Sequence, residues 1–123
     1  MALHLNTDDS IFLFSSIGDG YVEVNQQRYT ENLIVQPKKL HPRWTAANFN
    51  DLTLADFKFL AGLGPEVLLL GTGPLLRFPP SSLLRPLIEA GIGVEVMDLG
   101  AACRTYNILA NENRNVTAAL LFH

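Results

Sequence analysis

Two short segments hold the residues whose types and spacing could support chemistry. The first begins with two glycines at the end of a run of aliphatic residues. Glycines at the carboxyl end of a strand let backbone amides approach a phosphate or a carboxylate, and an aspartate after the next strand is placed where dinucleotide-binding proteins hold a ribose. These residues are a candidate surface for an anionic or nucleotide-like ligand or for a partner's carboxylate: Gly71, Thr72, Gly73, Arg77, Asp98 and Arg104.

The glycine segment departs from both known phosphate-binding fingerprints. The dinucleotide fingerprint needs a third glycine where Leu76 stands, and a P-loop needs a Gly-Lys-Ser or Gly-Lys-Thr sequence. The next helix is expected to begin only near Pro80, so a bound phosphate would not lie at a helix N-terminus. A structural turn is therefore the alternative. For Arg104, near the start of an expected helix, the alternative is an ion pair with Asp98 or Asp56, because the helix dipole disfavours an unpaired cation there.

The second segment is the one local concentration of positive charge. Its candidate interaction residues are Lys38, Lys39, His41, Arg43 and Trp44. Arginine and tryptophan are enriched among the residues that supply binding energy in protein interfaces. The alternative is that Trp44 packs over the edge of the core while the lysines stay solvated. A single tryptophan is too little for a groove that stacks the bases of single-stranded nucleic acid.

No set of residues with catalytic spacing is visible. General acid–base catalysis needs two carboxylates, or a carboxylate and a histidine, held together in a cleft, and the acidic residues here are dispersed. Cys103 shares a helical apolar stripe with Leu99 and Tyr106, so it is expected to pack as a small hydrophobic residue. Three scattered histidines and one cysteine do not supply a four-ligand zinc site. We therefore expect a protein that is not an enzyme and holds neither a metal nor a cofactor.

Length and composition limit the classes of protein to which this chain can belong. The 123 residues fit one domain, and 48 % hydrophobic residues are enough to form its core. Nine Lys and Arg against twelve Asp and Glu give a net charge of −3, which leaves no broad basic surface for nucleic acid. No apolar run approaches the roughly 20 residues of a transmembrane helix, and the first ten residues do not resemble a signal peptide. The single cysteine cannot form an intrachain disulfide, so a cytoplasmic protein is expected.

The hydrophobic pattern predicts the elements that must position these residues. The strands are expected at 11–17, 21–24, 33–36, 66–70, 92–97 and 116–122, and the helices at 54–61, 81–90 and 99–113. Gly18-Asp19-Gly20 predicts a hairpin turn, and 38–51 is expected to be a loop. The uninterrupted apolar strand 66–70 is expected at the centre of the sheet. Alternating strands and helices favour parallel units, so we predict a single α/β domain of three layers: a β-hairpin plus α, a mixed four-stranded sheet, and α.

Three stretches of the chain together resemble a known family. They are Val67–Gly73, Gly91–Met97 and Ala101–Leu109. They are similar to a small α/β family of largely uncharacterised bacterial and archaeal proteins, whose eukaryotic relatives include mitochondrial respiratory complex I assembly factor three and an adipogenesis-associated domain protein. The resemblance implies a three-layer fold and an assembly or interaction factor, with no established catalytic residues to transfer.

These observations lead to one expected function and one alternative. We expect a non-catalytic protein-interaction or assembly-factor-like module with a protein partner. The alternative is a small-molecule binding protein or enzyme whose site lies at Gly71-Thr72-Gly73. An exposed edge of the hairpin also offers a route to a homodimer.

Overall fold

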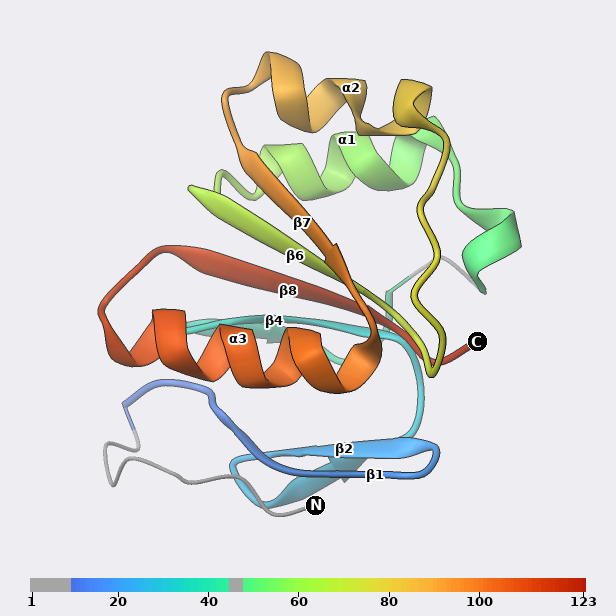
Figure 1. The fold of residues 1–123 in the computed structure, drawn as a ribbon. Helices are drawn as coiled ribbons and strands as arrows, with labels where there is room; N and C mark the ends of the chain where they lie inside the picture. Colours follow the sequence, from blue (N-terminus) through green and yellow to red (C-terminus); the bar gives the residue numbers. More distant parts are fainter. Residues whose placement is uncertain (1–9, 45–47) are drawn as a thin grey trace.

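The computed structural model describes residues 10–44 and 48–123 (Figure 1). Within these residues the chain forms a five-stranded sheet, a separate three-stranded sheet and three α-helices. Helices α1 (Leu54–Gly62) and α2 (Ser81–Glu89) cover one face of the five-stranded sheet. Helix α3 (Leu99–Asn111) and the three-stranded sheet cover the other face. The predicted three-layer α/β class is confirmed.

The five-stranded sheet is mixed, as predicted, and has the order β5-β4-β8-β6-β7. Its strands are β4 (Leu33–Gln36), β5 (Lys39–His41), β6 (Val67–Thr72), β7 (Gly93–Met97) and β8 (Val116–Leu121). Strand β6 runs parallel to β7 and β8, whereas β4 is antiparallel to β8 and β5. The central position belongs to β8, and β6 lies beside it. Alternate residues of β6 face opposite helical layers, which explains its continuous aliphatic run.

Two short strands lie where the sequence pattern predicted turns and loops. In the segment expected to be a loop, Pro37 and Lys38 form a two-residue turn, and β5 returns antiparallel to β4 as a fifth strand of the sheet. The same segment contains a 3-10 turn at Phe49–Asp51. The predicted hairpin, β1 (Phe14–Gly18) and β2 (Tyr21–Val24), is extended by β3 (Gln27–Tyr29). The prediction of four sheet strands and a two-stranded hairpin was therefore one strand short in each sheet.

The helices begin and end where local chemistry requires. Thr53 and Asp56 form a capping box at the start of α1: the Thr53 backbone N–H donates to Oδ2 of Asp56 over 2.9 Å, and the Asp56 N–H donates to Oγ1 of Thr53 over 3.4 Å. Asp98 caps α3, because its Oδ1 accepts a 2.8 Å hydrogen bond from the Ala101 N–H. The expected helix 81–90 forms with Pro86 inside it.

Helix α3 joins the two sheets through a pair of hydrogen bonds. The Phe14 N–H donates to Oδ1 of Asn107 over 2.9 Å, and Nδ2 of Asn107 donates to the Phe14 carbonyl over 2.8 Å. The side-chain amide thus bonds the β1 backbone as another strand would. Beside it, the Tyr106 hydroxyl donates to the Phe12 carbonyl over 2.9 Å, and the rings of Tyr106 and Phe14 meet edge to face.

The inner face of α3 packs directly on the five-stranded sheet. Cys103 is fully buried in this core, as its position on the apolar stripe predicts, and burial raises the pKa of its thiol far above the usual range. At Gly71 an added Cβ would lie 2.9 Å from Cδ2 of Leu120 on the neighbouring strand β8 and 3.1 Å from Cβ of Ala102 on α3. A side chain larger than hydrogen at Gly71 would therefore push α3 away from the sheet.

Replacing Asn107 with alanine is expected to reduce the free energy of unfolding by about 1–3 kcal/mol, because the buried backbone groups of Phe14 would lose both partners. The measurement is urea denaturation followed by circular dichroism. The matched control is Asn111→Ala, which changes an exposed residue of the same helix. Equal stability of the two variants would contradict the role given to Asn107.

Replacing Gly71 with alanine is expected to lower stability by about 1–3 kcal/mol, because α3 and β8 leave no room for the methyl group. The control is Gly62→Ala in α1, where no atom lies within 4 Å of the added Cβ and alanine favours the helix. Thermal melts of both variants test this expectation. A Gly71→Ala protein that melts at or above the wild-type temperature would show that the close approach is not needed.

Candidate functional site

The polar groups of the glycine segment bond mainly to the segment itself. The Thr72 hydroxyl donates to the Leu75 carbonyl over 2.7 Å and accepts a 3.1 Å hydrogen bond from the Arg77 N–H. The Arg77 guanidinium donates to the Thr72 carbonyl over 3.3 Å and lies over the Phe49 ring, 4.5 Å from its centroid. Thr72 and Arg77 therefore fold the connection after β6 into a closed loop.

The other candidate residues of this surface lie at or beside the first turns of α3. The Gly73 carbonyl accepts a 2.8 Å hydrogen bond from the Leu99 N–H, which ties the loop to the first turn of α3. Asp98 fills that helix N-terminus with its own carboxylate. Arg104 is exposed, and within the described part of the chain it forms no ion pair, so the expected pair with Asp98 or Asp56 is not found there.

A pocket of about 260 Å³ adjoins this loop. It lies between the hairpin turn Gly18-Asp19-Gly20, the Gly73-Pro74 turn and the start of α3. Asp19 and Asp98 both line it. Two carboxylates disfavour a phosphate or carboxylate ligand, so the pocket does not have the electrostatics that an anion site requires.

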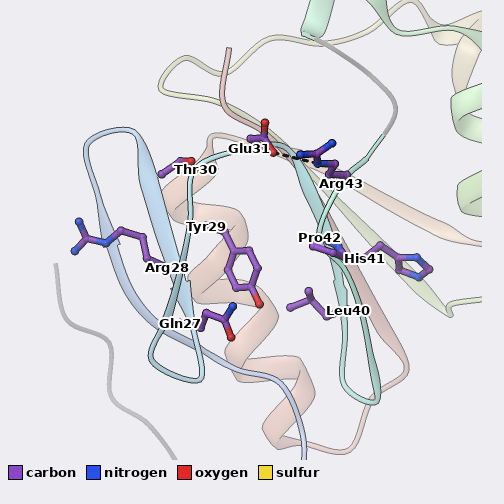
Figure 2. Close-up of a pocket in the computed structure, with 9 residues that line it drawn as sticks. All are labelled: Gln27, Arg28, Tyr29, Thr30, Glu31, Leu40, His41, Pro42 and Arg43. Carbon is purple, nitrogen blue, oxygen red and sulfur yellow. Dashed lines mark ion pairs between the residues drawn. The ribbon is translucent and has the colours of Figure 1, made fainter.

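A larger pocket lies beside the cationic segment. We call it the edge cleft, because β3 and β5, the terminal strands of the two sheets, line it on either side (Figure 2). Its volume is about 560 Å³. The side chains of Tyr29 and Leu40 form its apolar floor, and both pack against the core beneath α3. The lining residues are Gln27, Arg28, Tyr29, Thr30, Glu31, Leu40, His41, Pro42 and Arg43.

Arg43 lines the β5 side of the edge cleft and Lys39 stands on β5, whereas the Arg28 side chain points away from the cleft (Figure 2). Arg43 forms a 3.4 Å ion pair with Glu31, and the two side chains are 83 % and 65 % exposed. Arg28 pairs with Glu23 at 3.0 Å and lies over the Tyr21 ring. Lys39 is exposed on β5. Ion pairs this exposed to water are weak, so these cations can exchange their intramolecular partners for others.

Lys38 lies in the turn before β5, where its Nζ donates to the Ser10 carbonyl over 3.0 Å. His41 projects to the other face of the sheet. Its ring meets that of Phe59 edge to face with the centroids 5.8 Å apart. Burial and the nearby Lys39 lower the pKa of His41, which favours the neutral imidazole. These contacts tie Lys38 and His41 to the rest of the domain.

Trp44 is not an exposed anchor of this segment. It is only 6 % exposed and packs in the core beneath α1 and α2. Its backbone N–H donates to the Asn32 carbonyl over 3.0 Å, which fixes the end of the segment to the sheet. The structure thus selects the buried alternative for Trp44. Of the predicted interaction residues, Arg43 and His41 lie along the cleft, with the His41 ring turned to the other face of the sheet. Lys38 and Lys39 are exposed and line a separate pocket of about 290 Å³.

Sequence reasoning missed the β3 side of the cleft. Arg28, Tyr29 and Glu31 were not candidates, because no strand was expected after the hairpin. The sequence signal for a second tight turn was the pair Asn25-Gln26 between β2 and β3. In the structure the φ angles of these residues are 47° and 72°, in the left-handed region that a type I′ turn requires. Asparagine adopts that region readily, but the usual glycine at the second position is absent.

Residues 10–44 and 48–123 hold neither a metal-binding cluster nor a membrane-spanning helix. No cluster of three or more His, Cys, Asp or Glu side chains in these ranges could hold a metal ion. In the same ranges no helix combines the length and the apolar character needed to cross a membrane. The edge cleft, at about 560 Å³, has a greater volume than the pockets of about 290 and 260 Å³ elsewhere in the described residues.

Solved structures share this fold over nearly the whole chain. A crystal structure of a Bordetella parapertussis protein superimposes with a TM-score of 0.86 at 41 % identity and covers 93 % of this chain and 98 % of its own. A solution structure from Bordetella pertussis, described as a Mth938-like domain, gives 0.81 at 34 % identity over 98 % and 92 % of the two chains. An outer membrane protein from Bartonella henselae gives 0.76 at 29 % identity over 91 % and 95 %.

Curated relatives include respiratory assembly factors. NADH dehydrogenase [ubiquinone] 1 alpha subcomplex assembly factor 3 is 29 % identical in Xenopus tropicalis, over 95 % of this chain and 65 % of that protein, and 31 % identical in Bos taurus, over 91 % and 61 %. The 13 kDa major membrane protein of Francisella tularensis is 42 % identical over 57 residues, 46 % of each chain. This chain spans at most about two thirds of these relatives.

A protein-family model matches residues 14–121 of this chain, from the first strand of the hairpin to the end of β8. This range contains both sheets and all three helices described above. The resemblance seen in the sequence is thereby confirmed. The chain belongs to the family described as "Protein of unknown function (DUF498/DUF598)".

Proposed function

We propose that this chain is a protein-interaction module that assists the assembly of a multisubunit complex. The observation that carries the proposal is the extent of the similarity to the respiratory assembly factors, which covers 91 to 95 % of this chain for two of them. The shared part is therefore the complete two-sheet fold. Because those proteins are longer than this chain, their partners are not transferred here.

The surface supports a protein partner in preference to a small ligand. The polar groups of the Gly71-Thr72-Gly73 loop are used within the loop, and its pocket is lined by two carboxylates. The edge cleft instead combines an apolar floor, exposed cations and two terminal strands. Such a mixture of apolar centre and polar rim is typical of protein interfaces.

The proposal predicts that cells without this chain accumulate incomplete complexes. Membranes from a deletion strain of the source organism are compared with wild type on blue-native gels, with the respiratory NADH dehydrogenase followed by in-gel activity and all other complexes by mass spectrometry. We expect at least one complex to shift from full size to smaller subassemblies. The tagged chain should migrate with those subassemblies and not with the finished complex.

The control is complementation with the intact chain, which should restore the full-size complex. If every complex keeps its size and abundance in the deletion strain, and the tagged chain migrates with none of them, the chain does not act in assembly. A requirement for the chain in a soluble enzyme reaction, with all complexes intact, would likewise contradict the proposal.

A further inference from the structure

The outer edges of two different sheets border the edge cleft. In the described residues β5 is the last strand of the five-stranded sheet, and β3 is the last strand of the three-stranded sheet. Figure 2 shows Tyr29 of β3 and Leu40 of β5 in the space between the two strands, whereas Arg28 and His41 point away from it. An unpaired strand edge presents N–H and C=O groups to which an extended peptide can add as a further strand.

Leu40 carries the open backbone groups of β5. Strands β4 and β5 are joined by a two-residue turn, which makes the flanking residues, Gln36 and Lys39, a hydrogen-bonded pair. Because bonded and non-bonded pairs alternate, Val35 and Leu40 form a non-bonded pair, and the N–H and C=O of Leu40 point away from β4. Among the described residues, no backbone hydrogen bond of a turn or loop uses these two groups.

The neighbours of β5 restrict how a strand could add to it. Pro37 precedes the strand by two residues and Pro42 follows it directly, and proline has no N–H to offer a partner. Pairing is thus confined to a short segment centred on Leu40. A residue opposite Leu40 would place its side chain over the apolar floor beside Tyr29, and its neighbour along the chain would lie opposite Lys39 on the other face.

The charge around the cleft selects the chemistry of that segment. Three cationic side chains lie on β5 or close to it in the chain, against one carboxylate at the cleft: Lys38, Lys39 and Arg43, against Glu31. The whole chain has the opposite balance, nine against twelve. An acidic segment complements this surface, whereas pairing the β5 strands of two copies would bring both sets of lysines together.

We infer that the edge cleft binds an extended acidic segment of a partner protein, which adds to β5 as a strand beside Leu40. The segment places an apolar side chain over Tyr29 and Leu40 and a carboxylate opposite Lys39. This inference rests on the proposed function and specifies its surface and the kind of partner sequence that the surface takes.

The test uses a random twelve-residue peptide library displayed on phage and selected on the purified chain. The selected peptides are expected to share a short motif in which an apolar residue is flanked by Asp or Glu. The selected peptides are synthesised, and their binding to the chain is measured by fluorescence polarisation. Hydrogen exchange of the Leu40 amide of the chain is followed by NMR with and without peptide. Binding is expected to slow exchange at Leu40, because its N–H becomes the donor to the added strand.

Charge-reversal variants locate the binding surface. Lys39→Glu and Arg43→Glu change exposed side chains at the cleft, and each is expected to weaken binding of the selected peptides by about tenfold or more. The matched controls, Lys58→Glu on α1 and Arg85→Glu on α2, change equally exposed cations elsewhere and should leave binding unchanged. All four variants retain the buried core, and circular dichroism confirms their folding.

Several results would overturn the inference. Selected peptides without acidic residues would refute the charge argument, and peptides that bind without slowing exchange at Leu40 would refute strand addition. A dimer in sedimentation analysis that Lys39→Glu alters would assign the edge to a second copy of the chain. Any of these results can occur while the deletion strain still accumulates subassemblies, so this inference can fail while the assembly function stands.

Discussion

The two hydrogen bonds between Asn107 and Phe14 are the contact on which the arrangement of both sheets depends. A two-stranded hairpin is marginally stable at best, and the third strand and packing of the apolar face against a helix stabilise it. The Asn107 amide bonds the β1 backbone in the place of a further strand, while Tyr106 fills the space beside it. One edge of the small sheet is thereby closed by a helix of the main layer. Its opposite edge, β3, is left facing the cleft.

The close packing around β6 and the turn that follows it explain why glycines stand in a place that suggests ligand chemistry. Gly71 leaves room for Ala102 of α3 and Leu120 of β8, and Gly73 adopts a positive φ of 84° where the chain turns away beside Phe122. The first requirement comes from the close packing of α3 and β8 around β6, and the second from the turn that follows β6. A glycine that lets a phosphate approach the backbone also lets another part of the protein approach it. Here the packing of the protein against itself accounts for Gly71 and Gly73.

The sequence predicts the parts of the fold that long-range periodicity encodes. The three helices and the strands β4, β6, β7 and β8 follow from apolar spacing, because each buries a defined face. The strands β3 and β5 have three residues each, too few to show a period, and their existence depends on tight turns and on partner strands. The candidate site inherits this limit. The cationic segment is recognisable in the sequence, but β3 on the other side of the cleft is not. The burial of Trp44 depends on helices that are distant in the sequence.

The two candidate surfaces differ in how firmly their polar groups are already bonded. At the glycine loop, Thr72 is fully buried and its hydroxyl bonds at 2.7 Å inside its own turn, so a ligand would have to break buried bonds. At the edge cleft, the Arg43–Glu31 pair is long and mostly exposed, so water and a partner's carboxylate compete for Arg43 at little cost. The backbone groups of Leu40 are already directed outward. A domain without a visible catalytic set can still recognise a partner at such an edge, because the donors are held in place by the sheet and need only exchange water for the partner's backbone and side chains.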